Sequence, residues 1–261
     1  MILLDPQARP VIGHRGNRAY APENTLPALL EAVALGADAL EFDLRVSRDG
    51  QLMVIHDPTL ERTTDGRGAM AAHSAAELQR LDAGARFTPD GGKSFPWRGR
   101  GVGVPTFDQV IEALPRDLPL IIELKTAAAT EPLRRAVQRH GLAPRIIVAG
   151  FDPQATRPLR GAGFALGASR PDVLALLPAA LLHLRRKPRH VQALCIPPQW
   201  NGLPVPTAAL ARTLRGSGAV IHVWTINDAA EAHALWHAGV QGIISDDPAA
   251  MLAARRQGGD R

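Results

Sequence analysis

The sequence predicts a (β/α)8 TIM barrel, an α/β fold in which eight parallel strands are each followed by a helix. Two observations lead to this prediction: short apolar runs recur eight times along the chain, and a helical pattern follows each of them. The length of 261 residues is ordinary for one such barrel. We expect residues 1–261 to form a single catalytic domain, with an insertion at about residues 45–105 after the second strand.

The expected strands are continuously apolar, which is typical of strands that are buried on both faces of a parallel sheet. They lie at residues 11–15, 39–44, 120–124, 146–150, 164–168, 193–197, 220–225 and 242–245. The expected helices follow at residues 24–36, 106–115, 130–141, 153–162, 171–184, 207–217, 228–238 and 247–256.

The ends of several helices carry suitable residues. Side chains that can accept a hydrogen bond from the first helical N–H groups stand at Thr106, Thr207, Asn227 and either Asp246 or Asp247. Glycines stand where helices are expected to stop, at Gly36, Gly141 and Gly239. These signals support the alternation of strands and helices.

A hairpin signal follows the second strand. Arg48-Asp49-Gly50 separates two alternating runs, and Asp-Gly between such runs favours a tight turn. If Ser47 pairs with Leu52, then Asp43 pairs with His56, because the residue numbers of antiparallel partners add up to the same value along the ladder. The hairpin is therefore expected to bring His56 beside Asp43.

The remainder of the segment does not fit a plain barrel. Residues 52–57 are expected to form an extra antiparallel strand, because a parallel strand needs a longer crossover. Residues 58–105 are rich in Gly, Pro and Arg, with one short helical stretch near 74–81. We expect this insertion to form a lid or small subdomain over one end of the barrel.

Composition limits the possible partners and locations. No apolar run approaches the ~18–20 residues that span a bilayer, and no leader is visible at the N-terminus, so no stable membrane association is expected. Cys195 is the only cysteine and lies in an apolar run, which indicates a small core residue in a cytoplasmic protein. No oligomeric state is predicted by these features.

The net charge of +5 suits an anionic small molecule better than a nucleic acid. Basic residues are dispersed, and only residues 185–190 form a basic run. Aromatic residues make up only 4% of the chain, whereas nucleic-acid binders combine clustered charge with stacking aromatics. The basic run is interpreted as a solvated helix end and loop.

Carboxylates gather at the expected barrel mouth, where the carboxyl ends of the strands meet. Glu41 and Asp43 end the second strand and, being two residues apart, point to the same face. Glu123 ends the third strand. Three carboxylates suit Mg²⁺ or Ca²⁺, and zinc is disfavoured because no cysteine cluster is present.

Histidines and cations are expected at the same mouth. His14 and His56 can exchange protons near neutral pH, and Arg15 and Lys125 can bind a phosphate. Taken singly, each of these residues has an ordinary structural explanation, such as an ion pair or a solvated strand end. A metal and phosphate site is favoured because six residues at strand ends converge independently on one mouth: His14, Arg15, Glu41, Asp43, Glu123 and Lys125. His222, in contrast, stands in mid-strand and is expected in the barrel wall or core.

The ordered set of motifs resembles the glycerophosphodiester phosphodiesterases of the bacterial, cytoplasmic type. The matching segments span nearly the whole chain and are His14-Arg15-Gly16, Ala21-Pro22-Glu23-Asn24-Thr25, Glu41-Phe42-Asp43, Asp49-Gly50, residues 56–64, Leu81-Asp82-Ala83-Gly84, Pro105-Thr106, Glu123-Leu124-Lys125, residues 223–227 and residues 242–248.

The resemblance implies metal-dependent hydrolysis of glycerophosphodiesters to sn-glycerol 3-phosphate and an alcohol, a reaction of glycerol and lipid metabolism. It implies that His14 and His56 are the acid/base pair and that Glu41, Asp43 and Glu123 are the metal ligands. It implies that Arg15 and Lys125 contact the phosphate and that Trp224 lines the glycerol or head-group side of the pocket. It also suggests that a glycerol hydroxyl attacks phosphorus intramolecularly.

Two stretches depart from the family pattern. Ala149-Gly150-Phe151 stands where a serine commonly precedes the phenylalanine, and residues 170–206 match diffusely. We expect both stretches to shape the pocket for the alcohol, whose identity stays open.

Three other functions compete with this interpretation. A lysophospholipase D is the nearest, suggested by the three aromatic residues between Phe87 and Trp97. A non-catalytic phosphodiester-binding module is disfavoured because no histidine or carboxylate of the set is missing. A sugar-processing barrel is disfavoured because Glu41 and Asp43 lie on one strand and do not readily flank opposite faces of a sugar ring.

Overall fold

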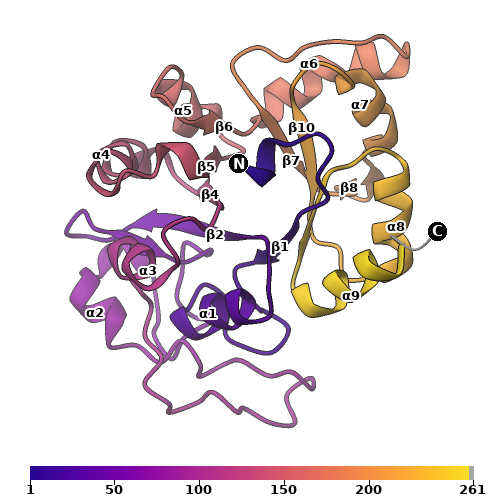
Figure 1. Cartoon of the computed structure of the whole chain (residues 1–261). Helices are drawn as coiled ribbons and strands as arrows, with labels where there is room; N and C mark the ends of the chain where they lie inside the picture. Colours follow the sequence, from indigo (N-terminus) through magenta and orange to yellow (C-terminus); the bar gives the residue numbers. More distant parts are fainter. Residues whose placement is uncertain (259–261) are drawn as a thin grey trace.

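The computed structural model describes residues 1–258, so residues 259–261 of the expected domain lie outside it. It shows a nearly closed barrel of eight parallel strands surrounded by helices, as predicted (Figure 1). In spatial order the strands are β6 (Ala165–Leu166), β5 (Ile146–Ala149), β4 (Leu120–Leu124), β2 (Ala39–Val46), β1 (Val11–His14), β11 (Gly242–Ser245), β10 (Val220–Val223) and β7 (Ala193–Ile196).

The barrel closes between β6 and β7 through few backbone contacts. Gly167 forms a parallel bridge with Ala193, and the N–H of Ala168 donates to the carbonyl of Ala193 over 2.8 Å. The N–H of Gln192 donates to the carbonyl of Leu166 over 2.9 Å. Strand β6 is therefore shorter than the predicted 164–168, but its flanking residues complete the cylinder.

The outer helices follow their strands as predicted. They are α1 (Leu26–Ala34), α3 (Phe107–Ala113), α4 (Thr130–His140), α5 (Pro153–Thr156), α6 (Arg170–Leu181), α7 (Thr207–Leu214), α8 (Ala229–His237) and α9 (Pro248–Gly258). Most are a few residues shorter than predicted. Helix α5 is a single turn that continues as the 3-10 turn η5 (Arg157–Leu159), and two further 3-10 turns flank α4: η3 (Ala127–Ala129) and η4 (Ala143–Arg145).

The predicted helix caps are partly confirmed. Thr106 caps α3 in a capping box, and Asp247 accepts a hydrogen bond from the N–H of Ala250 in α9. The prediction for Thr207 is wrong, because it is the first residue of α7. The prediction for Asn227 is also wrong, because Asp228 caps α8. The glycines predicted to end helices all have positive φ: Gly36, Gly141 and Gly239.

The amino-terminal turn η1 (Ile2–Leu4) seals the end of the barrel opposite the mouth. Leu3 is fully buried and packs against apolar residues inside the cylinder, such as Ile12 and Ile244. His222 lies in the barrel wall, as predicted, and its Nε2–H donates to the carbonyl of Leu3 over 2.9 Å. The barrel is thus a packed core with one open end.

The extra strand β3 (Leu52–Val54) pairs antiparallel with β2, as predicted. The predicted register is wrong by one residue. Val46 pairs with Leu52, and the N–H of Ile55 donates to the carbonyl of Asp43 over 3.1 Å. Asp43 therefore stands opposite Ile55 and not opposite His56.

The physical reason for the shift is a shorter loop. The N–H of Ser47 donates to the carbonyl of Gln51 over 2.9 Å, which leaves only residues 48–50 in the turn. Gly50 has φ +79°, the left-handed conformation that ends a three-residue hairpin loop. The predicted pairing of Ser47 with Leu52 would instead require a four-residue loop.

The inserted segment builds its own apolar cluster beside the barrel. It contains the 3-10 turn η2 (Met70–Ala72) and the short helix α2 (Ala75–Gln79), which lies within the predicted 74–81. Its buried side chains include Leu60, Leu78 and Val104. A second small element, the hairpin of β8 (Gln199–Trp200) and β9 (Leu203–Pro204), was not predicted.

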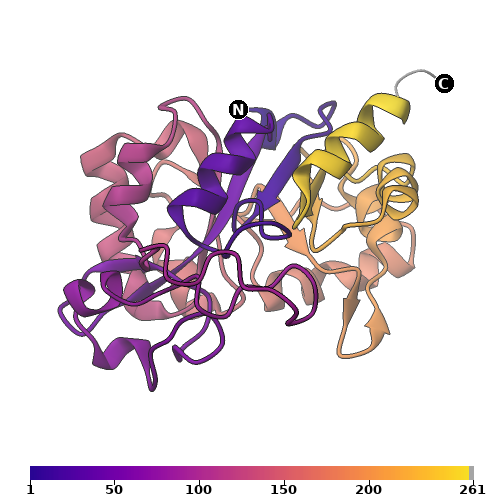
Figure 2. The same ribbon diagram turned by 90° about the horizontal axis from the view of Figure 1, so that it is seen from below.

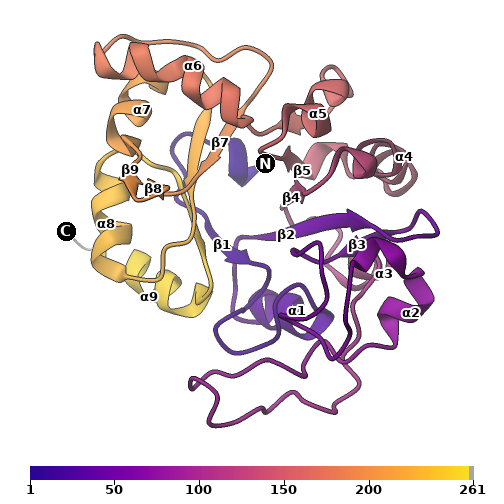
Figure 3. The ribbon, with the colours of Figure 1, turned by 180° about the vertical axis from the view of Figure 1, so that it is seen from behind.

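Both additions stand at the same end of the barrel, away from the N-terminus (Figure 2). Seen from behind, β3 and the β8–β9 hairpin flank the opening at the carboxyl ends of the strands (Figure 3). None of the described helices is both long enough and apolar enough to cross a bilayer.

Candidate active site

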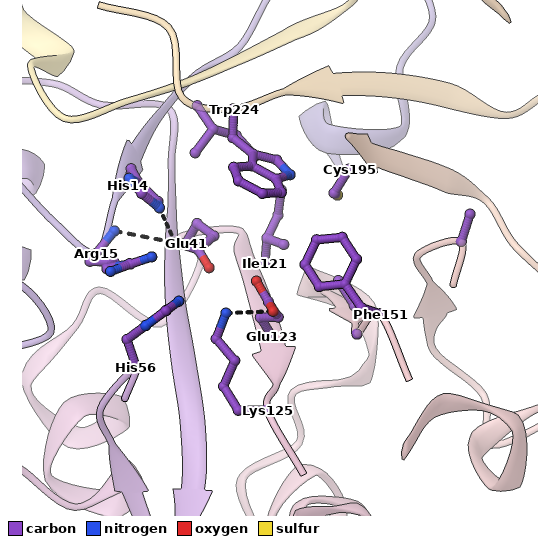
Figure 4. Close-up of a pocket in the computed structure, with 14 residues that line it drawn as sticks. His14, Arg15, Glu41, His56, Ile121, Glu123, Lys125, Phe151, Cys195 and Trp224 are labelled. Carbon is purple, nitrogen blue, oxygen red and sulfur yellow. Dashed lines mark hydrogen bonds and ion pairs between the residues drawn. The ribbon is translucent and has the colours of Figure 1, made fainter. Parts of the chain in front are cut away.

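Strand register brings the predicted residues together at the mouth. His14 on β1 stands beside Glu41 on β2, and Asp43 on β2 stands beside Glu123 on β4. A cavity of about 90 Å³ opens there (Figure 4). Seven of the eight predicted site residues line it, and they are His14, Arg15, Glu41, His56, Glu123, Lys125 and Trp224.

The chain must turn sharply after β1 to present Arg15. Arg15 and Gly16 both have positive φ, +55° and +91°. A Cβ atom on Gly16 would lie 2.4 Å from the backbone carbon of Ala28, so only glycine fits against helix α1. The His-Arg-Gly motif thus has a steric cause as well as a chemical one.

The three predicted metal ligands form one cluster. Glu41, Asp43 and Glu123 each offer a carboxylate oxygen, and these atoms all lie within 4.8 Å of one another. Asp43 is fully buried behind the cavity wall, where Asn24 Nδ2 donates to its Oδ2 over 2.8 Å. Its Oδ1 accepts no hydrogen bond of good geometry, although Lys125 Nζ lies 3.0 Å away. This donor set and the under-used oxygen fit a divalent cation.

Electrostatics in the cluster favour an added positive charge. Burial, together with the neighbouring Asp43 and Glu123 carboxylates, raises the pKa of Glu41 well above its ordinary value. Burial also raises the pKa of Glu123, against the opposing effect of Lys125. The pKa of Asp43 is lowered: burial opposes its ionisation, but Lys125 and Arg15 outweigh burial.

Two cations lie beside the carboxylates. Arg15 Nε lies 3.0 Å from Asp43 Oδ2, an ion pair without hydrogen-bond geometry, and Arg15 Nη1 donates to Glu23 Oε1 over 2.8 Å. Lys125 Nζ contacts both Asp43 and Glu123. Arg15 and Lys125 are positively charged and lie beside a small cavity, so they can bind an anionic group such as a phosphate there.

Each histidine is held by an aspartate. His14 Nδ1 lies 2.6 Å from Asp246 Oδ1, and His56 Nδ1 lies 2.6 Å from Asp57 Oδ1. Because a carboxylate accepts, both Nδ1 atoms carry the proton in the neutral rings, which leaves each Nε2 with a free lone pair. His14 Nε2 lies 3.9 Å from Glu41 Oε2. Burial lowers the pKa of both histidines.

One buried glutamate connects the two histidine–aspartate pairs. Glu23, only 8% exposed, accepts hydrogen bonds from Arg15, Arg18 and Arg62. Arg18 also donates to Asp246, the partner of His14. Arg62 likewise donates to Asp57, the partner of His56. Burial opposes ionisation of Glu23, but the three arginines outweigh it and lower its pKa strongly.

The opposite wall of the cavity is apolar. It is formed by Trp224, Phe151 and Cys195, which face the carboxylates in Figure 4, while Ile121 lies beside Glu123 on β4. The rings of Phe151 and Trp224 meet edge to face with centroids 5.7 Å apart. Burial raises the pKa of the Cys195 thiol far above its ordinary value. The predicted core position is confirmed only in part, because Cys195 packs against the core but is half-buried and lines the cavity.

Sequence reasoning missed the supporting residues. Asp57 and Glu23 lie inside the matching motifs but have no predicted role, and Asp246 is predicted as a possible helix cap, whereas the structure places it against His14. The aromatic residues between Phe87 and Trp97 are absent from the cavity lining. A signal for Asp57 was present in the sequence, because an aspartate directly after a site histidine is within reach of its ring.

A barrel whose mouth gathers three carboxylates, two histidines and two cations defines a class of enzymes that act on phosphate esters. Within that class, the chain belongs to the glycerophosphoryl diester phosphodiesterase family, whose sequence profile matches residues 14–250. The chain is therefore an enzyme of the phosphoric diester hydrolases.

Relatives of known name support this assignment. A glycerophosphodiester phosphodiesterase of Caldanaerobacter subterraneus subsp. tengcongensis is 31% identical over 264 residues, covering 95% of this chain and 98% of that protein. A Bacillus subtilis glycerophosphodiester phosphodiesterase is 27% identical, covering 94% of this chain and 86% of its own length.

Solved structures show the same fold. An Agrobacterium tumefaciens glycerophosphodiester phosphodiesterase superposes with a TM-score of 0.74 at 28% identity, covering 94% of this chain and 99% of that one. An Oleispira antarctica phosphodiesterase, solved in complex with the product sn-glycerol-3-phosphate, gives a TM-score of 0.73 at 25% identity, covering 95% and 97%.

Proposed function

We propose that this enzyme hydrolyses glycerophosphodiesters to sn-glycerol 3-phosphate and an alcohol. The observation that carries the proposal is the single cavity that joins the Glu41–Asp43–Glu123 cluster to two histidines and two cations. The Oleispira relative bound to sn-glycerol-3-phosphate supports a small-molecule product of this kind. We further propose that barrel and insertion act as one catalytic domain, because β3 pairs directly with β2.

Glu41, Asp43 and Glu123 would hold the divalent cation, Mg²⁺ or Ca²⁺. All ligands are oxygens, which both ions prefer, and the raised pKa of Glu41 reflects negative charge that such an ion would neutralise. When bound, the cation supplies a Lewis acid for substrate oxygens. The residues of the chain perform the binding and proton transfers.

The cations would hold the phosphate and the apolar wall would face the glycerol. Arg15 and Lys125 both line the cavity and reach it from the side of His56. Trp224 lines the opposite side, where an aromatic face can pack against the carbon atoms of glycerol. The leaving alcohol would then extend from the cation side toward solvent.

The two histidines would act as base and acid. His14 faces Glu41 and the glycerol side and is 7% exposed, so its Nε2 would take the proton from the glycerol hydroxyl next to the phosphoester. That oxygen attacks phosphorus, and the bond from phosphorus to the leaving alcohol breaks. His56, whose side chain is 32% exposed, would enter this step as the imidazolium, with a proton on Nε2 as well as on Nδ1, and would donate the Nε2 proton to the departing alkoxide.

Water then opens the cyclic phosphate with the roles reversed. His56 accepts a proton from the attacking water, and protonated His14 returns a proton to the glycerol oxygen as the ring opens. Intramolecular attack gains the advantage of a positioned nucleophile. A diester whose adjacent hydroxyl is methylated would test this order of steps, because undiminished hydrolysis would require direct attack by water.

The function itself is tested by following release of glycerol 3-phosphate. Wild type and His14→Ala would be assayed on glycerophosphocholine, with and without chelator, and with Mg²⁺ or Ca²⁺ restored. We expect activity only in wild type with the metal. Activity that survives chelation would remove the cation from the proposal, and activity that survives His14→Ala would remove the base.

We also propose a cytoplasmic location. A lone cysteine forms no intrachain disulfide, which is compatible with a reducing compartment, and cell fractionation would test the assignment.

A further inference from the structure

A second, apolar cavity adjoins the catalytic one. It measures about 260 Å³ and is lined by α6, the end of β7 and the β8–β9 hairpin. Phe151, Ala168 and Cys195 line both cavities, so the two lie side by side. We call this second cavity the apolar groove; its remaining lining residues include Val173, Leu174, Leu177, Ile196, Trp200 and Leu203.

A row of aromatic rings leads from the catalytic cavity into the groove. Trp224 meets Phe151 at a centroid distance of 5.7 Å, and Phe151 meets Trp200 at 5.5 Å. Among the described residues that line the groove, only Arg170 is charged, and its guanidinium lies over the Trp200 ring. The groove therefore suits a hydrocarbon chain: apart from Arg170, the Cys195 thiol and the indole N–H of Trp200, which has no partner among the described residues, its lining side chains are apolar.

The outer rim of the groove exposes apolar side chains to solvent. Leu174 on α6 is 52% exposed and Leu203 on the β8–β9 hairpin is 71% exposed. Large exposed leucines on both sides of one apolar cavity indicate a surface that a ligand covers. Burial of a hydrocarbon chain between them would remove this surface from water.

The order of groups along the two cavities decides which part of a substrate reaches the groove. The cations and His56 lie at one end, the carboxylates lie in the middle, and Trp224 and Phe151 lie at the other end (Figure 4). When the phosphate binds between Arg15 and Lys125, the glycerol lies over the carboxylate cluster. The groove then continues from the glycerol, on the side away from the leaving alcohol.

We propose that the groove binds a hydrocarbon chain attached to the glycerol, so that lysoglycerophospholipids with a free hydroxyl next to the phosphoester are substrates. This inference rests on the proposed function. Residues 170–206, expected from the sequence to shape the pocket for the alcohol, would then contact the opposite end of the substrate. The lipid would thus contact the apolar groove and not the 87–97 loop, whose aromatic residues suggest a lipid substrate in the sequence.

A series of short ether lipids tests the proposal without micelles. Wild type would be assayed on glycerophosphocholine and on its 1-O-butyl, 1-O-hexyl and 1-O-octyl derivatives, and on the n-hexyl ester of glycerol 3-phosphate, which carries the chain on the leaving alcohol. We expect kcat/KM to rise about two- to fourfold for each added methylene that enters the groove. The hexyl ester is expected to gain nothing comparable.

Matched surface variants localise the effect. Leu174→Asp places a charge at the rim, and we expect it to lower the ratio of octyl-ether to glycerophosphocholine kcat/KM at least about tenfold. Leu30→Asp changes a leucine of similar exposure, 41%, on α1 across the barrel, and is expected to leave that ratio unchanged. Both positions are solvent-exposed, so both variants are expected to fold.

The outcomes separate the two proposals. Hydrolysis of glycerophosphocholine without any gain along the ether series would overturn the groove assignment and leave the proposed function intact. A gain confined to the hexyl ester would also overturn it, since the chain would then belong to the alcohol. Hydrolysis of none of these diesters by the metal-loaded enzyme would overturn both.

Discussion

His14 and Asp246 are separated by 232 positions in the chain, yet Nδ1 of the histidine lies 2.6 Å from Oδ1 of the aspartate. Strands β1 and β11 are neighbours in the closed barrel, and this places the residue after β11 against the last residue of β1. His56 has an equivalent partner in the adjacent Asp57. The site thus contains two histidine–aspartate pairs of similar geometry. One pair joins residues far apart in the sequence, and the other joins sequence neighbours.

Asp246→Asn tests whether the aspartate fixes the tautomer of His14. The amide can donate to Nδ1 and stabilise the tautomer with its proton on Nε2, which cannot accept a proton from substrate. We expect kcat for glycerophosphocholine to fall roughly 10²- to 10⁴-fold. Asp117→Asn, an exposed position on another loop, is the control. An unchanged kcat would show that His14 needs no such partner.

Glu23→Gln tests the glutamate that connects both pairs. The neutral amide cannot accept from three arginines, so Arg18 and Arg62 lose the anchor that orients Asp246 and Asp57. We expect kcat to fall about 10²-fold, as for a small misplacement of reacting groups. The Nδ1–H proton resonances of His14 and His56 should move together in the NMR spectrum.

Glu23→Asp keeps the charge and is expected to restore part of the kcat. Glu112→Gln, on the exposed face of α3, is the matched control. A shift in only one of the two histidine resonances would contradict a shared anchor.

Glu41→Gln is expected to weaken metal binding and to increase the stability of the metal-free enzyme. The substitution removes a buried carboxylate whose ionisation is opposed by burial, Asp43 and Glu123. We expect the metal-free enzyme to gain about 1 kcal/mol in the free energy of unfolding, measured with urea in the presence of chelator. Calorimetric titration with Mg²⁺ and Ca²⁺ should show weaker binding. Stronger binding would contradict the assignment of Glu41 as a ligand.

His222 is expected to make stability depend on pH. Burial lowers its pKa from 6.5 to about 4, and its Nδ1 has no partner among the described residues. The folded state therefore excludes a proton that the unfolded chain binds, so this contribution to stability is constant above about pH 6.5 and is lost as the pH falls toward 4.

Between pH 7 and pH 5 the linked loss amounts to about 2 kcal/mol in the free energy of unfolding. His222→Gln keeps a donor for the carbonyl of Leu3 but does not titrate. Urea unfolding of both proteins at the two pH values checks the prediction. An equal pH dependence in wild type and variant would show that His222 does not contribute to it.

Local patterns predicted most of the fold. Continuous apolar strands and amphipathic helices have their own periods, so the eight units and their order could be derived from neighbouring residues alone. The pairs Glu41–Asp43 and Glu123–Lys125 were also predictable, because residues two apart on a strand share a face. The one register error arose where a single residue decides the outcome, in the loop at residues 48–50.

The sequence by itself determined the barrel, the residues at its mouth and their chemical types. Only the tertiary structure decided which of them touch: the Asp246 contact to His14, the convergence of three arginines on Glu23, and the aromatic row from Trp224 to Trp200. Strand periodicity is a local property, and it specifies the direction of a side chain. Contacts across a closed barrel depend on the stagger of distant strands and on loop lengths, which no local pattern contains.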